Sequence, residues 1–461
     1  MSAQAPGETL RALDTAHHLH PFTDHKALGN KGSRIITRAD GVYLWDSEGK
    51  QLLDGMAGLW CVNVGYGRRE LAEVARQQMI ELPYYNNFFQ CTHPPAVELA
   101  ALLAEVTPPS LEHVFFTNSG SEANDTVVRM VRRFWEVEGQ PERQIVISRW
   151  NAYHGSTMAG ASLGGMKPMH EQGGLPIPGI EHIEQPYWFK LGGTQSPEEF
   201  GLAAARWLDE RITELGPGRV AAFIAEPVQG AGGVIVPPDS YWPEIVRICD
   251  RHGILLVCDE VICGFGRTGR WFGCQHFGVT PDLMPIAKGL SSGYLPIGGV
   301  MVSKRVAEAL IHRGGEFNHG FTYSGHPACA AVAAANIRIL REEGIIEKVH
   351  DDLSPYFLQQ LQRLGELPLV GEIRGVGLMA GIELCADPRK RTPFTNEGDV
   401  GSLCRDHSLE AGLVMRAVGD SMILSPPLVI TRDQIDELVD KASEAITRTA
   451  REVLGPRYTG P

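Results

Sequence analysis

The sequence predicts an α/β fold, with a large domain built on a mostly parallel sheet and a smaller α+β domain. In the middle of the chain, short and continuously apolar runs alternate with stretches of helical periodicity, which is typical of parallel strands covered on both faces. After about residue 330 the pattern changes to paired strands and a long helix. The apolar runs are residues 113–118, 144–150, 220–228, 253–261, 283–289 and 298–303.

The C-terminal part predicts a sheet of its own. Residues 370–385 predict two strands, residues 413–431 predict two more, and a helix is expected from about 432 to 452. Residues 40–58 predict a hairpin that joins this part. The predicted division is an N-terminal segment contributing to the small domain (1–67), a large domain (68–330) and a C-terminal small domain (331–461).

Composition excludes several classes of function. The formal net charge of −13 argues against nucleic acid or an anionic membrane as partner, because both require basic patches. The nine cysteines are scattered without a CxxC pair, so neither a disulfide framework nor a metal site is expected. The N-terminus lacks signal-peptide features, and no apolar run approaches the roughly 20 residues of a membrane helix. We therefore expect a cytoplasmic protein.

One lysine differs from the others in its surroundings. Only Lys288 ends an apolar, strand-like run, LMPIAKG. It is either the first exposed residue beyond a strand or a buried amine, and in the second case desolvation lowers its pKa so that the neutral form can attack an aldehyde.

A carboxylate follows another apolar run. Asp259 comes directly after GILLVC, where an unpaired charge would be costly. Asp259 either pairs with an arginine, caps a turn, or contacts the ring nitrogen of pyridoxal phosphate (PLP), a cofactor usually held by a lysine Schiff base with an acidic residue at that nitrogen.

The segment NSGSEANDTVV (118–128) predicts the start of a helix. Ser119 and Glu122 fit a capping box, which places Gly120 and Ser121 in the first turn, where free N–H groups and the helix dipole attract phosphate. A capped helix without a ligand is the alternative. The expected buried face of this helix consists of Val127, Met130, Val131, Phe134 and Trp135.

These candidate residues share one edge of the predicted sheet. Each lies at or just past the carboxyl end of a strand, where open α/β sheets bind their ligands. The set comprises Ser119, Gly120, Ser121, Tyr153, Glu226, Asp259 and Lys288.

The sequence resembles the class III (ω-amino acid) aminotransferases, which have the PLP-dependent fold type I of aspartate aminotransferase. The resemblance runs from about residue 20 to 450 and is most specific in LLVCDEVICGFGRTGRWFG (255–273) and PDLMPIAKGLSSGYLPIGGV (281–300). Within the family the chain is most similar to amine–pyruvate transaminases of the putrescine or polyamine branch. Residues 56–67, 315–327 and 413–431 carry that closer likeness.

The resemblance implies roles for the cofactor site. Lys288 would hold PLP and shuttle a proton, and Asp259 would keep the pyridine nitrogen protonated. The two ring faces would be covered by Tyr153 and Val261. Further cofactor contacts would come from Ser119, Gly120, Ser121, His154, Glu226 and Thr322 of the partner subunit. The last contact implies a homodimer or homotetramer with the active site at the dimer interface.

The resemblance also implies a substrate pocket. It would be shaped by Phe22, Trp60, Phe88, Phe89, Tyr153 and Ala231. Arg416 would bind the carboxylate of the keto acid and swing aside for an amine that lacks one. The alternatives are that Trp60 and the phenylalanine pair belong to the core and that Arg416 forms a surface ion pair.

The predicted reaction is ping-pong transfer of an amino group from putrescine, another diamine or a primary amine to pyruvate. Alternatives within the family are a β-alanine, 4-aminobutyrate or ornithine aminotransferase using 2-oxoglutarate, or an aminomutase. Two motifs suggest other classes: GFGRTG (264–269) a dehydrogenase, and GASLG (160–164) a hydrolase with Ser162 as nucleophile. Neither has the required strand–turn–helix context. The NDT sequon at Asn124 is expected to have no role.

Overall fold

The computed structural model describes residues 6–458, which form three sheets. The largest has seven strands in the order β4-β10-β9-β8-β7-β5-β6. β10 is antiparallel to β4 and β9, whereas the other pairs are parallel, which confirms the mostly parallel sheet. The strands are β4 (Leu111–Thr117), β5 (Ile145–Arg149), β6 (Ile180–Ile183), β7 (Val220–Ala225), β8 (Leu255–Cys258), β9 (Leu283–Ile286) and β10 (Gly298–Ser303). β6 was not predicted, because two polar residues interrupt its short sequence IEHI, which therefore contains no continuous apolar run.

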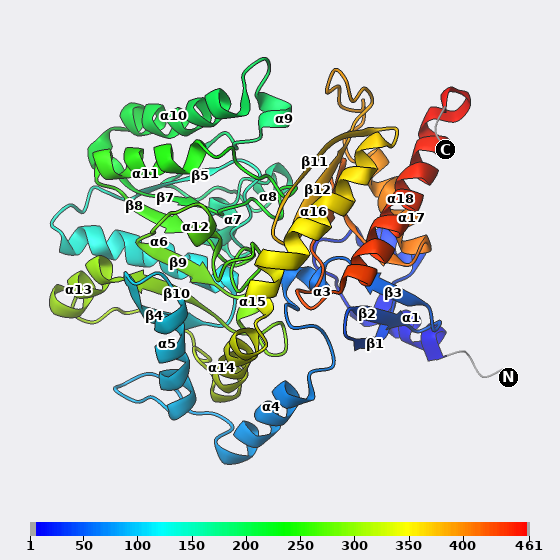
Figure 1. The fold of residues 1–461 in the computed structure, drawn as a ribbon. Helices are drawn as coiled ribbons and strands as arrows, with labels where there is room; N and C mark the ends of the chain where they lie inside the picture. The colour runs from blue at the N-terminus through cyan, green and yellow to red at the C-terminus, as the bar shows by residue number, and fades with distance from the viewer. Residues whose placement is uncertain (1–5, 459–461) are drawn as a thin grey trace.

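Helices cover both faces of this sheet, as the continuously apolar strands require (Figure 1). Alternate residues of β7 pack into two different hydrophobic clusters, Phe223 on one face and Ile224 on the other. The first face packs against α10 (Pro197–Leu215) and α11 (Tyr241–His252), and the second against α6 (Gly120–Val137) and α13 (Lys304–Arg313). The predicted apolar face of α6 is buried throughout.

The C-terminal part forms an antiparallel sheet in the order β11-β12-β15-β14. Its strands are β11 (Val370–Val376), β12 (Met379–Leu384), β14 (Arg416–Val418) and β15 (Ser421–Leu424). α16 (Ser354–Gln362), α17 (Asp399–Glu410) and α18 (Arg432–Leu454) pack beside it. The two strands predicted in 413–431 are confirmed as β14 and β15, and the same segment also contains β13 (Leu413–Val414), which pairs with a different sheet.

The hairpin of β2 (Tyr43–Asp46) and β3 (Gln51–Asp54) joins the C-terminal part as expected. The connection is a third sheet, β1-β2-β3-β13, in which β1 (Ile36–Asp40) is the outer strand and β13 runs parallel to β3. The domain boundaries at residues 67 and 330 stay a prediction, and residues 1–5 and 459–461 of the outer segments lie outside the described residues.

The remaining α-helices connect these layers. They are α1 (Pro6–His17), α2 (His25–Lys31), α3 (Ala57–Trp60), α4 (Arg69–Glu81), α5 (Pro94–Val106), α7 (Met158–Leu163), α8 (Lys167–His170), α9 (Trp188–Leu191), α12 (Gly273–His276), α14 (Pro327–Glu342) and α15 (Ile345–Lys348). Between residues 6 and 458, none of the helices combines the length and apolarity needed to span a membrane.

Candidate active site

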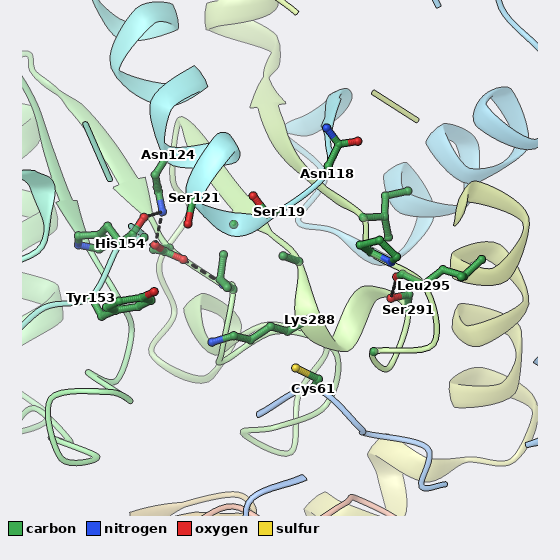
Figure 2. Close-up of a pocket in the computed structure, with 18 residues that line it drawn as sticks. Cys61, Asn118, Ser119, Ser121, Asn124, Tyr153, His154, Lys288, Ser291 and Leu295 are labelled. Atoms are coloured by element: carbon green, nitrogen blue, oxygen red, sulfur yellow. Dashed lines mark hydrogen bonds and ion pairs between the residues drawn. The ribbon is translucent and has the colours of Figure 1, made fainter. Parts of the chain in front are cut away.

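The carboxyl ends of β5, β8 and β9 and the start of α6 surround a cavity of about 400 Å³ (Figure 2). This is the sheet edge at which the sequence places the candidate residues. The lining residues include Asn118, Ser119, Gly120, Ser121, Asn124, Tyr153, His154, Gly155, Asp259, Val261 and Lys288.

Lys288 lies two residues beyond β9, and its side chain extends across the cavity toward Tyr153 (Figure 2). Its backbone has φ +47, a left-handed conformation that non-glycine residues rarely adopt and that often occurs at functional sites. The Lys288 amine has no hydrogen bond or ion pair with any residue in 6–458. Loss of hydration lowers its pKa, and the nearby Cys61 and Asp259 partly oppose that shift. The neutral form of this amine is therefore easier to reach than that of an exposed lysine.

Asp259 is the first residue after β8 and is buried. Its Oδ2 lies 2.8 Å from Asn124 Nδ2, which donates to it, and 2.7 Å from His154 Nδ1. Its Oδ1 accepts from the Val261 N–H at 3.0 Å. These contacts fix the carboxylate without an arginine, so the alternative that Asp259 pairs with an arginine is wrong.

Two neighbours of Asp259 keep polar atoms without partners. Asn124 Oδ1 and His154 Nε2 are buried and form no hydrogen bond within the described chain. Asn124 was not among the predicted site residues, since only its sequon was expected to have no role, and His154 was implied only by resemblance. The available signal for Asn124 was its position among Val127, Val128 and Val131, because a polar residue on a buried helix face needs a partner.

The start of α6 lies tightly against the neighbouring loops. The Ser119 Oγ accepts from the Glu122 N–H at 3.2 Å, as a capping residue does. The reciprocal half of the predicted capping box was wrong, because Asn118 offers both its N–H and its side-chain amide to Glu122 Oε2, at 2.7 and 2.9 Å.

Two glycines make the close approach around this helix start possible. A Cβ on Gly120 would lie 2.9 Å from the Val261 methyl groups, and one on Gly155 would lie 2.7 Å from Ser121 Cα. The free N–H groups of the first turn of α6 therefore border the cavity in a backbone cradle that suits a phosphate.

Glu226 does not line the cavity itself but contacts Tyr153, which does. The Tyr153 N–H donates to Glu226 Oε1 at 3.4 Å. Burial raises the pKa of Glu226 to about 7, although the charges of His154 and Arg149 act in the opposite direction. Glu226 Oε2 has no hydrogen bond among the described residues, and the nearest Arg149 nitrogen is 3.9 Å away.

Arg416, at the start of β14, is half-buried and has no hydrogen bond or ion pair within residues 6–458. Desolvation lowers its pKa, and Tyr153 opposes that shift. The charge of Arg416 also lowers the pKa of Lys288, so the two side chains are close enough to interact electrostatically. The alternative of a surface ion pair is wrong, and a desolvated guanidinium without a partner suits a carboxylate ligand.

The expected substrate residues divide into two groups. Trp60 and Ala231 are buried in one hydrophobic cluster, and Tyr153 packs against it. Trp60 Nε1 is without a partner in the described chain. The Phe22 side chain is 73% exposed, but its ring meets Tyr153 edge-on at 6.3 Å between centroids. This group lies beside the cavity.

The second group lies elsewhere in the same chain. Phe88 lines a different cavity, together with Phe115 and His319, and Phe89 is 90% exposed. The Thr322 carbonyl accepts from the Tyr84 hydroxyl at 2.6 Å. None of the three lines the Lys288 cavity of its own chain, so their predicted roles at the site stay predictions that need a second subunit.

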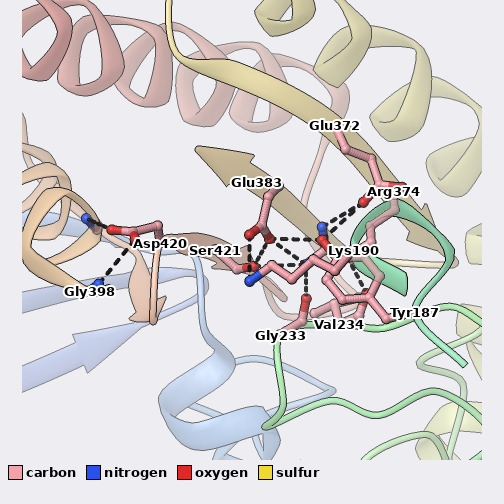
Figure 3. Close-up of polar contacts among 11 residues, drawn as sticks. Tyr187, Lys190, Gly233, Val234, Glu372, Arg374, Glu383, Gly398, Asp420 and Ser421 are labelled. Atoms are coloured by element: carbon pink, nitrogen blue, oxygen red, sulfur yellow. Dashed lines mark hydrogen bonds and ion pairs between the residues drawn. The ribbon is translucent and has the colours of Figure 1, made fainter. Parts of the chain in front are cut away.

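A buried ionic network supports the loop that carries Ala231 (Figure 3). Arg374 donates to the carbonyls of Gly233 and Val234 and pairs with Glu372 at 2.9 Å. Glu383 joins the network by binding Tyr187, Lys190 and Ser421. This network could not be predicted from the sequence, because Arg374 and Gly233 are 141 residues apart.

The two motifs of other enzyme classes have structural roles. GFGRTG forms turns, in which the buried Arg267 donates to the carbonyls of Leu378 and Pro426. Ser162 lies inside the helix α7 and donates to the Met158 carbonyl. The predictions that neither motif has the dehydrogenase or hydrolase context are confirmed.

The cavity residues fit PLP. The unpaired Lys288 amine suits a carbonyl carbon, the fixed Asp259 carboxylate suits a protonated ring nitrogen, and the Gly120 cradle suits the phosphate. His154 and Asn124 both line this cavity, and His154 Nε2 and Asn124 Oδ1 are buried without a hydrogen-bond partner among the described residues.

Comparisons with known proteins agree with this geometry. The family model of class III aminotransferases matches residues 27–446. The chain is 62% identical to putrescine–pyruvate aminotransferase of Pseudomonas aeruginosa (strain PAO1), covering 96% of this chain and 97% of that protein. It is 40% identical to diaminobutyrate–2-oxoglutarate transaminase of Halomonas elongata, covering 94% and 93%.

A solved structure extends the agreement to the fold. The ω-transaminase of Pseudomonas jessenii, in complex with pyridoxamine phosphate (PMP), has a TM-score of 0.94 and 40% identity, covering 96% of this chain and 99% of that one. The fold is thus that of PLP-dependent fold type I, and the chain belongs to the class III family of PLP-dependent aminotransferases.

Proposed function

We propose that this protein transfers an amino group from putrescine, another diamine or a primary amine to pyruvate. The observation that carries the proposal is the 62% identity to a putrescine–pyruvate aminotransferase, which extends over nearly the full length of both chains. The site supports it chemically, because a free lysine amine and a fixed carboxylate line one cavity, and the charge of the unpaired Arg416 guanidinium acts on that lysine.

Lys288 carries the central proton transfer in this proposal. PLP supplies an electrophilic carbon for the amine and an electron sink for the carbanion. Lys288 would hold the cofactor through Nζ and, when its amine is free and neutral, would remove the proton from the amine-bearing carbon of the donor. The lowered pKa of Lys288 supports this role.

Asp259 holds a proton on the pyridine nitrogen. Its carboxylate remains oriented because Asn124 and His154 both contact Oδ2. Tyr153 and Val261 would cover the two faces of the bound ring, His154 would contribute to the polar wall, and Glu226 would support that wall through Tyr153. Ser119, Gly120 and Ser121 bind the phosphate at the start of α6, where the helix dipole favours an anion.

Arg416 selects the keto acid. A guanidinium binds a carboxylate through two parallel hydrogen bonds, and Arg416 has no protein partner to compete with such a ligand. In the first half-reaction the donor amine carries no carboxylate, so Arg416 turns away. Phe22, Trp60, Tyr153 and Ala231 then form the apolar wall for the donor's carbon chain.

Two subunits are required for a complete site. Thr322 of the partner subunit would add a phosphate contact, and the partner's Phe88 and Phe89 would close the donor pocket. The position of Phe89 on this chain, 90% exposed, supports a role across an interface. We therefore propose a homodimer or a homotetramer.

We place the protein in the cytoplasm. All nine cysteines are free, and seven of them are buried, which suits a compartment that keeps thiols reduced.

The test is a matrix of donors and acceptors with the purified holoenzyme. Putrescine, cadaverine, β-alanine and a benzylic amine are each paired with pyruvate and with 2-oxoglutarate, and kcat/KM is measured for every pair. We expect putrescine with pyruvate to give the highest value. Preference for 2-oxoglutarate, the acceptor named for the 40% identical diaminobutyrate transaminase, would overturn the acceptor assignment.

A further inference from the structure

We propose that Asp14, His18 and His20 form a binding site for a divalent transition-metal ion, for which Zn²⁺ is the best-suited probe. Their ligand atoms all lie within 4.8 Å of one another, and no other group of three histidine, cysteine or carboxylate side chains among residues 6–458 meets that limit. The cluster is separate from the cofactor cavity, and amino transfer does not use it.

The donor atoms already converge on one point. His18 Nδ1 lies 3.0 Å from Asp14 Oδ1, and His20 Nε2 lies 2.9 Å from the same oxygen and 3.0 Å from Oδ2. In tetrahedral zinc sites with bonds of about 2.0–2.2 Å, neighbouring ligand atoms are about 3.3 Å apart. The two nitrogens therefore need to move a few tenths of an ångström from the Asp14 oxygen, and their own separation, which is within 4.8 Å, has to reach the same value. The two imidazole rings already lie side by side, with centroids 4.2 Å apart.

The local chain favours a cation here. Asp14 lies in the last turn of α1 and His18 is the first residue past it, one helical turn from Asp14. The C-terminal end of a helix carries a partial negative charge, which adds to the Asp14 carboxylate. Metal bound to His18 Nδ1 and His20 Nε2 leaves each ring proton on the other nitrogen, which is the neutral form that binds metals.

The ion can enter from solvent and would keep an open position. The His18 side chain is 59% exposed, whereas the Asp14 side chain is 14% exposed and provides a more rigid anchor. Three protein ligands leave the fourth tetrahedral position to water, unlike closed structural zinc sites with four protein ligands.

The cluster is connected to the donor side of the active site. His20 lines a cavity of about 1040 Å³ together with Phe22, two residues further along the chain, and Phe22 contacts the Tyr153 ring. A metal bound to His20 would restrict this segment, so we expect it to raise the KM for the amine without changing that for the keto acid. This coupling rests on the proposed function, whereas the binding itself does not.

The binding test uses untagged holoenzyme that has been freed of metal by dialysis against a chelator. Zn²⁺ is titrated by calorimetry, and Co²⁺ is titrated by visible absorption to report coordination geometry. We expect one ion per chain, with His18→Ala and His20→Ala each weakening binding at least tenfold. His17→Ala is the matched control, because His17 is an exposed neighbour outside the cluster. Circular dichroism and cofactor absorbance verify that every variant is folded.

Three binding results would overturn the site: no saturable binding to wild type, unchanged affinity in His18→Ala and His20→Ala, or an equal loss in His17→Ala. Steady-state kinetics then test the coupling. Zn²⁺ should raise the amine KM of wild type and not of His20→Ala. If Zn²⁺ binds but the amine KM does not change, the coupling to the active site is wrong and the metal site stands. If the enzyme has no amino-transfer activity, the proposed function is wrong, and the calorimetry still tests the metal site.

Discussion

The molecule contains two buried polar clusters that differ in whether their polar atoms have hydrogen-bond partners. Around Asp259, the side chains of Asn124, His154 and Glu226 each keep one buried atom without a partner, and the Lys288 amine has no partner among the described residues. Around Arg374, the ionic and hydroxyl groups of Glu372, Glu383 and Tyr187 are paired. Both clusters are fixed in position, but only the first has unused bonding capacity.

The difference indicates which cluster awaits a ligand. An unsatisfied buried polar group costs about 1–3 kcal/mol, so several at one place are retained only where a bound group satisfies them. A fully paired network instead stabilises one arrangement of the chain. The Asp259 cluster is thus a binding site and the Arg374 network a support, and four experiments test that distinction in order of expected effect.

Lys288→Ala should have the largest effect, because it removes the amine that holds the cofactor and transfers the proton. We expect kcat to fall by at least about 10⁴-fold, with loss of the absorbance of the covalently bound cofactor. The free energy of unfolding should change little. Lys304→Ala, at an exposed lysine on α13, is the control and should change none of these quantities.

Arg374→Met should mainly lower the stability of the fold, whereas Lys288→Ala mainly lowers kcat. Removing Arg374 leaves Glu372 without its counter-charge and leaves Lys190 as the cation that still pairs with Glu383, which costs about 3–5 kcal/mol of the free energy of unfolding. Denaturant titration measures the loss. The exposed pair of Arg363 with Asp440 provides the control, and Arg363→Met should cost at most about 1 kcal/mol. Similar losses in both variants would remove the distinction between a buried support and a surface contact.

Glu226→Gln tests the electrostatics of the binding cluster in cofactor-free protein. The pKa of Glu226 is raised from 4.5 to about 7, so the folded state retains a proton that the unfolded state releases between these values. Its contribution to stability is present in full below about pH 4.5 and is lost as pH rises through 7. The stability of wild type relative to Glu226→Gln should therefore fall by roughly 3 kcal/mol between pH 4.5 and 8.

Denaturant titrations at several pH values measure this difference. Glu198→Gln, at an exposed residue on α10, is the control and should leave the pH dependence unchanged. A difference between wild type and Glu226→Gln that does not vary with pH would contradict the raised pKa.

Arg416→Ala should have the smallest effect, confined to one half-reaction. Loss of hydrogen bonds to a charged ligand costs about 1.5–3 kcal/mol, so KM for pyruvate should rise about 10- to 100-fold. Single-turnover kinetics should show little change for the amine. Arg416→Lys retains the positive charge but loses the planar guanidinium that binds a carboxylate through two hydrogen bonds. Its KM for pyruvate should therefore lie between those of wild type and Arg416→Ala. Equal losses in both half-reactions would contradict the assignment of Arg416 to the acceptor.

Much of the fold could be predicted because its signals are local. Continuous apolar runs identified six strands of the large sheet, and the capping pattern at Ser119 located the start of α6. The four-residue β6 and the division of β13 from β14 were missed, since short strands acquire their identity from the sheet that pairs with them.

The site residues show the same limit. Lys288 and Asp259 were found because each interrupts or follows an apolar run. Asn124 was missed because its partner, Asp259, is 135 residues away. The convergence of His18 and His20 on Asp14 likewise appears only once the chain turns after α1. Exposure of Phe89, and the absence of Thr322 from the Lys288 cavity, depend on where whole elements pack.

The sequence by itself determined the layered α/β architecture, the lysine and carboxylate at the strand ends, and the likeness to class III aminotransferases. These features depend on hydrophobic periodicity and on motifs within a few residues. The tertiary structure decided which buried polar groups satisfy one another and which remain free. Hydrogen bonding is short-ranged in space but not along the chain, so the contrast between the Asp259 and Arg374 clusters exists only in the folded protein.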